Sequence, residues 1–241
     1  MDGNLNKLIK NFKVIRNKNW VPSVRKGPTG IGRTFEQLLS IQENNLNIPD
    51  YNGIEIKTKR HYSNAYTTLF NCNPINNIEE IKNKYGYPDK VLPQYKVLNN
   101  SIFSNNFTRV NPNFYFRLHV NRQEKRIYLY IYNKSKKLIN TDTYWTFESL
   151  KTKLAKTKYL GFILALRKIN SGKEYFKYYK LNIYKLKSFN QFIKLIGNST
   201  IRITFKIGVF RTGQREGQTH NHGVGFDIKE NDLSQLYDIV Y

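Results

Sequence analysis

Cysteine, acidic residues and long apolar runs are all scarce in this sequence. Its single cysteine, Cys72, excludes an internal disulfide framework and a zinc site built on a Cys-x-x-Cys pair. No stretch of about 18 consecutive apolar residues occurs, which excludes a transmembrane helix. The N-terminal residues are polar and lack the apolar stretch of a secretory signal. We therefore expect a cytoplasmic protein that has no membrane partner.

The shortage of acids leaves a large positive charge. The 17 Asp and Glu residues stand against 40 Lys and Arg residues, which gives a net charge of +23. This excess indicates a polyanionic partner, because each phosphate that a cation neutralises releases condensed counterions. A biased composition alone would raise the number of lysines but would not explain so few acids. The basic residues are spread along the chain and not gathered on one amphipathic helix, which favours nucleic acid over a membrane surface.

The apolar pattern predicts a folded α/β protein with a mixed sheet, in one domain or two small lobes. Helices are expected at residues 4–16, from a cap at Thr34 to about residue 44, near 78–84, and at 145–156. Strands are expected at residues 53–59, 114–121, 126–132, 159–166 and 201–210, followed by a glycine-dotted loop at 211–225 and a final strand and short helix. Residues 175–180, rich in tyrosine and lysine, are interpreted as a strand edge.

Four of the 17 acidic residues fall within twenty residues of the chain. They are Glu36, Glu43, Asp50 and Glu55. On the strand expected at 53–59, Glu55 and Lys57 leave the same face, while Ile54 and Ile56 anchor the other face in the core. Asp50 comes from the turn just before this strand, close enough to share a cation with Glu55.

Two carboxylates and a lysine on one strand edge suit the hydrolysis of a phosphodiester bond. The oxygens of Asp50 and Glu55 are ligands that Mg²⁺ prefers, and the backbone carbonyl of Ile56 between them could be a further ligand. Such a metal acidifies a bound water and offsets charge on the phosphate. Lys57 would position or deprotonate that water. The alternative is a solvated strand with an ordinary Glu–Lys pair.

These residues also form a known pattern. Asp50-x4-Glu55-x-Lys57 matches the PD-(D/E)xK signature of restriction-endonuclease-like nucleases, and residues 25–39 resemble the MvaI/BcnI restriction endonucleases and the related mismatch-repair nickase MutH. The resemblance implies that Glu36, on a helix after a Gly-rich loop, joins the active site and supports the metal or the lysine.

The same resemblance implies a restriction-endonuclease-like fold, opened into two lobes around a basic DNA cleft. Residues 1–110 would form the catalytic lobe. Residues 111–241 would complete the core and carry DNA recognition.

The likeness extends to residues 217–226, which look like the family's DNA-reading loop. It implies that His220 and His222 donate to guanine in the major groove. Two alternating histidines without a further ligand are a weak zinc signal, and an ordinary polar loop is the other alternative. Arg211 and Arg215 flank the loop, and either reading bases or holding phosphates fits them.

Some positions depart from the family pattern. On the strand before the histidines, Thr204 and Lys206 stand where the family carries an acid and an arginine that are implied to read C·G pairs, and Asp227 replaces a later arginine. Lys206 remains a candidate for contact in the major groove. The resemblance therefore implies nuclease chemistry more firmly than the CCWGG or CCSGG targets of the best-known members.

Residues 27–34 nearly match a phosphate-binding P-loop. Arg33 stands where a lysine is required, and Pro22 breaks the segment that should be a buried strand, so nucleotide binding is disfavoured. Lys26 and Arg33, with exposed backbone amides, suit a DNA phosphate near the active site instead.

The sequence thus predicts a Mg²⁺-dependent, sequence-specific type II restriction endonuclease acting on double-stranded DNA. The resemblance implies a monomer that nicks one strand at a time, with a cognate DNA methyltransferase in the same system. Two alternatives stay open: a MutH-like repair nickase under the control of a partner, and a non-catalytic nucleic-acid-binding protein whose acidic cluster is structural.

Overall fold

The computed structural model describes residues 2–41 and 48–241, and it divides into two compact units. Unit 1 comprises Met1–Ala65, Ala155–Lys187 and Ser234–Tyr241. Unit 2 comprises Tyr66–Leu154 and Ser188–Leu233. No helix of the described residues is long and apolar enough to cross a membrane.

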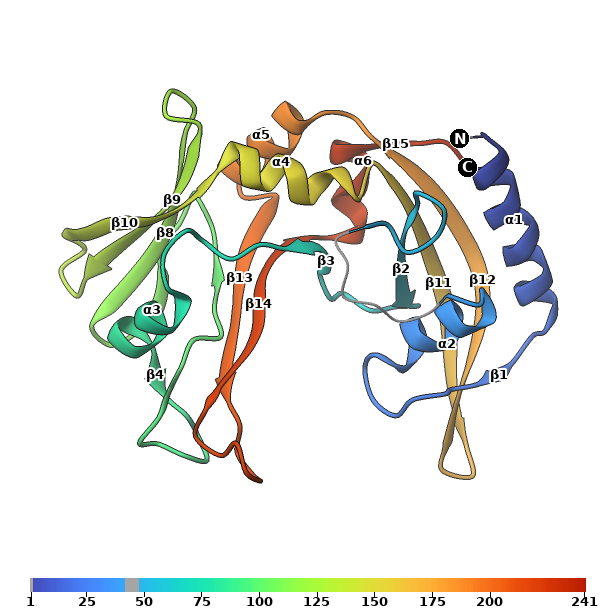
Figure 1. Ribbon diagram of the computed structural model, residues 1–241, viewed down its shortest axis with the longest axis horizontal. Coiled ribbons are helices and arrows are strands. Elements are labelled where there is room, and N and C mark those ends of the chain that lie inside the picture. Colours follow the sequence, from blue (N-terminus) through green and yellow to red (C-terminus); the bar gives the residue numbers. More distant parts are fainter. Residues whose placement is uncertain (1, 42–47) are drawn as a thin grey trace. The chain divides into compact units, whose positions relative to one another are not determined.

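Unit 1 is built on one five-stranded sheet (Figure 1). Its strands, in spatial order, are β1 (Val21–Pro22), β12 (Lys173–Leu186), β11 (Tyr159–Asn170) and β2 (Glu55–Arg60), and β15 (Tyr237–Ile239) also pairs with β12. β11 and β12 form an antiparallel hairpin, and β2 runs parallel to β11. The sequence predicted a single boundary near residue 110. The two compact units divide at other positions, because β11 and β12, which come after residue 110, complete the sheet to which β2 belongs.

The first helix, α1 (Asp2–Asn17), packs against β12 and confirms the helix expected at residues 4–16. Leu8, Phe12 and Ile15 recur at helical spacing and are buried in the core of unit 1. This one apolar stripe explains why the helix lies along the sheet with its lysines outward.

The second helix, α2 (Gly30–Leu38), packs against β2 but has different ends from those expected. The cap predicted at Thr34 is wrong, because Thr34 lies inside the helix, where its buried hydroxyl accepts a hydrogen bond from the Val24 amide at 3.1 Å. The helix ends at Leu38, and Ser40 adopts a left-handed φ of 58°. Residues 42–44 of the expected helix, with Glu43, lie outside the described residues.

Unit 2 holds two four-stranded sheets and a two-stranded ribbon. The first sheet has the order β10 (Leu138–Thr146), β9 (Arg126–Asn133), β8 (Phe114–Asn121) and β7 (Thr108–Asn111). The second has the order β3 (Thr67–Asn71), β14 (Thr219–Ile228), β13 (Ile201–Val209) and β6 (Ser101–Ile102). The ribbon pairs β4 (Tyr87–Pro88) with β5 (Lys96–Val97). The remaining elements of unit 2 are α3 (Ile78–Tyr85), α4 (Phe147–Ala155, whose last residue is assigned to unit 1), α5 (Phe189–Gly197) and a 3-10 turn (Glu230–Asp232). The short helix α6 (Leu233–Leu236) lies mostly in unit 1.

Trp145 lies at the centre of the core of unit 2. It is fully buried, its indole Nε1 donates to the Cys72 carbonyl at 2.9 Å, and its ring contacts Phe205 and Phe226 edge-on. Trp145 belongs to β10, where it pairs with Ile127, so the helix expected from residue 145 begins at Phe147 instead.

Most other expected elements are confirmed. Those at 78–84, 114–121, 126–132, 159–166 and 201–210 correspond to α3, β8, β9, β11 and β13. Residues 175–180 lie in β12 as expected for a strand. On the side away from β11, the two-residue strand β1 pairs with Tyr175 and Phe176, and β15 pairs with residues 184–186. The loop expected at 211–225 is too long, because β14 begins at Thr219.

Candidate functional site

A tight turn places Asp50 beside the strand β2. Tyr51 and Ile54 exchange two backbone hydrogen bonds of 2.9 Å across it. The two central residues, Asn52 and Gly53, have positive φ values of 47° and 86°, as Asn-Gly hairpin turns require. The chain therefore folds back, and the Ile56 amide donates to Asp50 Oδ2 at 2.9 Å.

Helix α1 holds this turn in place. The Asn11 side-chain amide donates to the Tyr51 hydroxyl at 2.8 Å, and the Asn4 side-chain amide donates to the Asn52 carbonyl at 2.9 Å. Tyr51 itself is buried. The position of Asp50 is thus fixed by the N-terminal helix as well as by the turn.

Glu55 is the centre of the polar cluster on β2. It is 1% exposed, and its Oε1 lies 2.6 Å from Lys57 Nζ and 3.0 Å from Lys156 Nζ. Glu55 and Lys57 therefore do share one face of the strand, as predicted. Lys156, which directly follows α4, was not among the predicted site residues.

The second oxygen of Glu55 has an unusual environment. Among the described residues, none forms a hydrogen bond with Glu55 Oε2, although this atom is buried. A buried carboxylate oxygen without a partner carries a full desolvation cost, which a bound cation would offset. With the Asp50 carboxylate and the Ile56 carbonyl close by in the chain, the donor set consists of hard oxygens, which fits a divalent ion such as Mg²⁺.

The electrostatic environment of Asp50 also favours a bound divalent cation. Burial raises the pKa of Asp50, and the Glu55 carboxylate adds to the rise, while the Ile56 amide and the charges of Lys57 and Lys156 oppose it. Two acidic groups that disfavour each other's charge are stabilised by a cation between them. This pair is therefore suited to hold a metal.

Glu36 lies on α2 and lines a pocket of about 370 Å³ together with part of β2. The lining also includes Arg25, Arg33, Ile56 and Lys57. Arg33 Nη1 lies 3.6 Å from Glu36 Oε2. The structure thus brings Glu36 and Arg33 to the pocket of Lys57, but among the described residues no third acid, histidine or cysteine joins Asp50 and Glu55 as a compact metal-ligand group.

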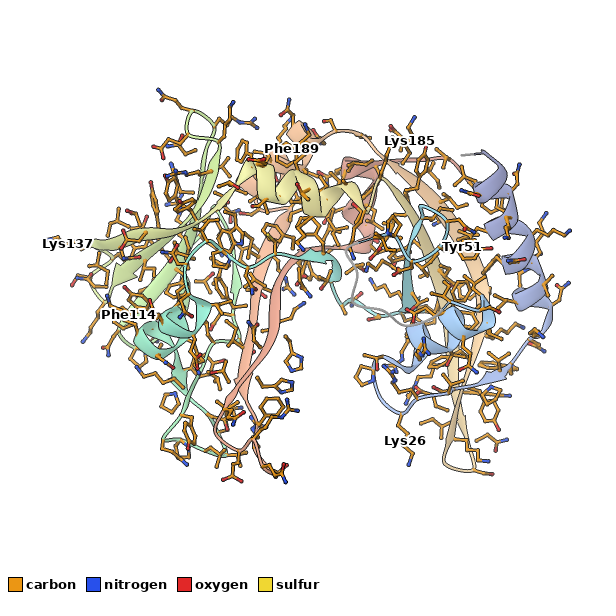
Figure 2. The ribbon with its side chains drawn as sticks, in the orientation of Figure 1. Lys26, Tyr51, Phe114, Lys137, Lys185 and Phe189 are labelled. Atoms are coloured by element: carbon orange, nitrogen blue, oxygen red, sulfur yellow. The ribbon has the colours of Figure 1, made fainter. Side chains whose placement is uncertain are left out.

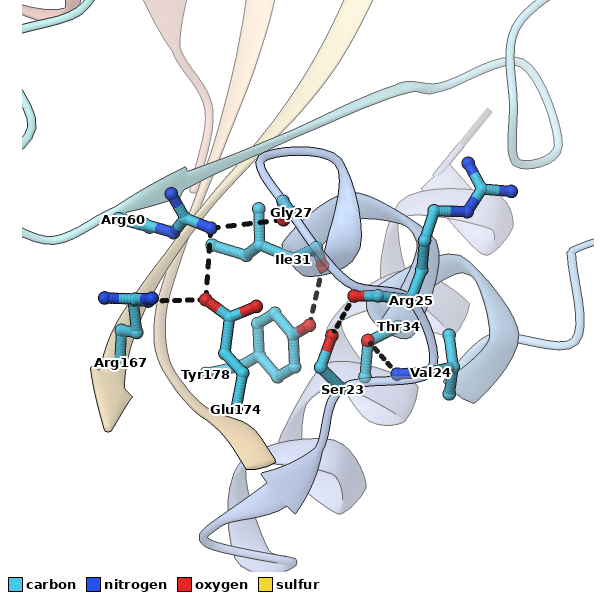
Figure 3. Close-up of polar contacts among 10 residues, drawn as sticks. All are labelled: Ser23, Val24, Arg25, Gly27, Ile31, Thr34, Arg60, Arg167, Glu174 and Tyr178. Carbon is cyan, nitrogen blue, oxygen red and sulfur yellow. Dashed lines mark hydrogen bonds and ion pairs between the residues drawn. The ribbon is translucent and has the colours of Figure 1, made fainter. Parts of the chain in front are cut away.

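Polar contacts hold the loop before α2 against the sheet of unit 1 (Figure 3). Arg60 donates to the Gly27 carbonyl at 3.3 Å and to Glu174 Oε1 at 3.1 Å, and Arg167 also binds Glu174. The Tyr178 hydroxyl donates to the Ile31 carbonyl at 2.7 Å. Because β1 before this loop has only two residues and runs antiparallel to β12, the loop lacks the strand of a P-loop.

Lys26 stands at the outside of the same loop. Figure 2 shows its side chain extending away from the ribbon, and the residue is exposed. An exposed lysine on a braced loop suits contact with a phosphate and carries no sequence information.

Three of the predicted DNA-reading residues of unit 2, Lys206, His220 and His222, share one face of the β13–β14 hairpin. The inward residues of β13 are buried and apolar: Ile201, Ile203, Phe205, Ile207 and Val209. The alternating outward residues include Lys206, and across the hairpin His220 pairs with Gly208. His220 and His222 therefore lie on a strand and not in the loop that the sequence predicted.

An aromatic stack fixes the two histidines. The rings of His220 and Phe210 are nearly parallel at 4.1 Å, the rings of His220 and His222 lie 3.9 Å apart, and the Arg215 guanidinium lies 4.0 Å from the Phe210 ring. Burial lowers the pKa of His220, and the nearby His222 and Arg215 lower it further. A neutral imidazole offers one donor and one acceptor, a pattern that can distinguish base edges.

Two other predicted contacts, Lys206 on this face and Arg211 after the end of β13, are paired with acids. Arg211 forms two hydrogen bonds with Asp89, at 3.1 and 2.9 Å. Lys206 donates to Thr68 Oγ1 at 2.9 Å and lies 3.7 Å from Asp227 Oδ1. Both cations are therefore positioned before any ligand binds.

Comparisons with known proteins agree with this geometry. The family model of the MvaI/BcnI restriction endonuclease family matches residues 9–237. The chain belongs to the MvaI/BcnI restriction endonuclease family. It is therefore a type II restriction endonuclease, a site-specific DNA nuclease, and it has the restriction-endonuclease-like fold that the sequence predicted.

Two solved structures support the membership. A complex of the restriction endonuclease MvaI with its cognate DNA substrate is similar with a TM-score of 0.91 and 32% identity, over 99% of this chain and 98% of that chain. MvaI in the absence of DNA is similar with a TM-score of 0.63 and 31% identity, over 99% and 97% of the two chains. The search of curated proteins found no match. The similarity to a DNA complex supports double-stranded DNA as the partner of this family member, and restriction endonucleases generally use a divalent metal.

Lys156 gives the first prediction, because it binds the buried carboxylate of the candidate active site. Lys156→Met keeps the length of the side chain but removes one of the two cations on Glu55 Oε1. We expect a loss of about 10- to 100-fold in cleavage rate, the usual effect of removing a group that holds a metal ligand, with DNA binding unchanged. Single-turnover cleavage of a labelled duplex measures the loss. The exposed Lys151, on α4, supplies the control variant Lys151→Met, and equal rates for the two variants would contradict the assignment of Lys156.

Proposed function

We propose that this restriction endonuclease uses Mg²⁺ and that its active site is formed by Glu36, Asp50, Glu55 and Lys57. The observation that carries the proposal is the buried Oε2 of Glu55, which has no hydrogen-bond partner in the described part of the chain and lies near the Asp50 carboxylate. Asp50, Glu55 and the Ile56 carbonyl would hold the metal. Such an ion would acidify a bound water and offset the charge that develops on the phosphate.

Lys57 and Glu36 act on the water and the phosphate in this proposal. The Nζ of Lys57, held at 2.6 Å by Glu55, has N–H groups left to orient the attacking water and to offset charge on a phosphate oxygen. Glu36 lines the same pocket as Lys57 and supports the lysine from α2. Its ion pair with Arg33 keeps a second cation at the pocket, where a DNA phosphate would bind.

Sequence recognition is assigned to the outward face of the β13–β14 hairpin. Lys206, Arg211, His220 and His222 offer donors of fixed orientation, which suit the acceptors of guanine in the major groove. Arg215, stacked on Phe210, and the exposed Lys26 of unit 1 suit phosphates instead. In this proposal unit 1 carries catalysis and unit 2 carries recognition.

We also propose that the enzyme acts as a monomer in the cytoplasm and nicks one strand at a time, beside a cognate DNA methyltransferase. A single set of catalytic side chains in one chain supports sequential nicking, because each strand needs its own passage through the site. The methyltransferase follows from the restriction function, since the host's own copies of the target sequence must be protected.

The second prediction tests the metal and the order of strand cleavage together. We expect a supercoiled plasmid with one target to become a nicked circle first and a linear product later, with Mg²⁺ and not with EDTA. Gel electrophoresis of a time course measures both steps. Cleavage in EDTA would contradict the metal, and linear product without a nicked intermediate would contradict sequential nicking.

A further inference from the structure

Three acidic residues are buried among the described residues: Glu55, Asp89 and Asp227. Burying a carboxylate costs free energy unless cations and hydrogen bonds surround it. A buried acid therefore calls for an explanation at each of these three positions. Glu55 belongs to the catalytic cluster. Asp89 and Asp227 belong to unit 2, where Asp227 lies beside Lys206 of the outward face of the β13–β14 hairpin and Asp89 binds Arg211, which follows the end of β13.

Asp227, on β14, is the centre of a small network. Thr68 Oγ1 donates to Asp227 Oδ1 at 2.7 Å, and Lys206 Nζ donates to Thr68 Oγ1 at 2.9 Å. Arg202 Nε lies 3.6 Å from Asp227 Oδ2. A Cβ atom at Gly225 would lie 2.7 Å from Lys206 Nζ and 2.8 Å from Asp227 Oδ1, so only glycine leaves room for this arrangement.

The network leaves part of the Lys206 ammonium available. Of its three N–H groups, one binds Thr68 and a second is within ion-pair distance of Asp227. The side chain is 34% exposed. At least one donor therefore points away from the two partners, in a direction that they fix.

Asp89 holds Arg211 in a comparable way. Its Oδ1 accepts hydrogen bonds from the amides of Val91 and Leu92, at 3.0 and 3.1 Å, which fixes the carboxylate in its own turn. Both oxygens then bind Arg211, through Nε and Nη2. The Nη1 group of Arg211 takes part in neither of these two bonds and is available to donate to a ligand, on a side chain that is 52% exposed. The hydrogen bonds from Arg211 hold the pKa of Asp89 well below its usual value, so the pair stays charged.

We propose that Asp89 and Asp227 are positioning residues for sequence recognition, which fix Arg211 and Lys206 in the orientation that reads a guanine. This rests on the proposed function of the hairpin face. A phosphate contact requires only a nearby positive charge, and a carboxylate behind it would weaken binding to DNA. A base contact requires a donor at one angle, and a fixed side chain loses less entropy when it binds. Two carboxylates behind two cations are therefore explained by base recognition.

Neutralising either acid should have opposite effects on specific and on nonspecific binding to DNA. Asp227→Asn and Asp89→Asn each remove a negative charge near DNA, so nonspecific affinity should stay equal or rise. The preference at one base pair should fall by about 10-fold or more, the usual value of a good base contact. Glu216→Gln is the control, because Glu216 is an exposed acid on the loop between β13 and β14. It should leave every base preference unchanged.

Base preferences are measured by selection of bound duplexes from a random library, with the full chain and in EDTA. Double variants test whether each acid acts through its cation. Asp227→Asn should cause no further loss of base preference in a Lys206→Met background, and Asp89→Asn should cause none in an Arg211→Met background. Unchanged preferences, or losses that add to those of the cation variants, would overturn the proposal. An Asn variant with a lowered midpoint of thermal unfolding is replaced by the Glu variant, which keeps the charge, shifts the carboxylate and should show the same loss.

Because the selection needs no cleavage, it separates this proposal from the catalytic one. A wild-type protein that selects a sequence but does not cut with Mg²⁺ would contradict the proposed active site alone. A wild-type protein without any base preference would overturn the positioning role, since no orientation would then matter.

Discussion

Replacing Glu55 by glutamine should reduce cleavage on the order of 10³-fold while DNA binding in EDTA is retained. The substitution keeps the size of the side chain but removes the charge that two ammonium groups share, from Lys57 at 2.6 Å and Lys156 at 3.0 Å. It also replaces one carboxylate oxygen of the proposed metal site, which includes the buried Oε2 that has no hydrogen-bond partner among the described residues. Single-turnover cleavage across a range of Mg²⁺ concentrations measures the loss, and higher Mg²⁺ should not restore the rate.

The matched control is Asp238→Asn, which neutralises an acid of unit 1 whose side chain is 65% exposed. It should cleave like the wild type. Asp50→Asn should behave like Glu55→Gln, because both carboxylates belong to the proposed metal site. A Glu55→Gln enzyme with a rate close to that of the wild type would remove β2 from the active site.

The affinity for DNA should fall steeply with salt, by roughly 10³-fold or more between about 50 and 200 mM. The net charge of +23 supplies many cations, and each neutralised phosphate releases a counterion to the solvent. A plot of log Kd against log salt concentration, measured in EDTA with specific and nonspecific duplexes, gives the number of phosphate contacts. A nearly flat plot would undo the electrostatic argument from composition.

Replacing single lysines shows which of them contribute to the salt dependence of DNA binding. Lys26→Met should reduce the salt slope by about one contact and lower the affinity for all sequences alike. Lys7→Met, on the exposed face of α1, should leave the slope unchanged, because Lys7 belongs to no proposed DNA contact. A change of base preference in Lys26→Met would reclassify this residue as a reader of bases.

The polar cluster of the proposed active site could be predicted from the sequence because it is local. Asp50, Glu55 and Lys57 lie within one turn and one strand, and both the Asn-Gly turn and the alternation of β2 are short-range signals. Lys156 could not be predicted in this way. It reaches Glu55 because β11 pairs in parallel with β2, and no local pattern distinguishes it among 40 basic residues.

The arrangement of the proposed recognition face could not be predicted, because it depends on residues that are distant in the sequence. Its glycines suggested a loop, whereas the structure has a strand in which Gly225 leaves room for Lys206 and Asp227. The departure at Asp227 was visible in the sequence, but its partner Thr68 lies on β3, far away in the chain. The cap expected at Thr34 failed for a similar reason, because a tertiary hydrogen bond to Val24 uses its hydroxyl.

Digestion of phage DNA with the purified protein, followed by sequencing of the fragment ends, shows whether the enzyme cuts at one specific sequence and whether the cut depends on a divalent metal. With Mg²⁺, we predict discrete fragments whose ends share one short sequence, and with EDTA or with the Glu55→Gln variant we predict intact DNA. Intact unmethylated DNA with every divalent metal, or fragments with random ends, would contradict a metal-dependent, site-specific endonuclease with its active site on β2.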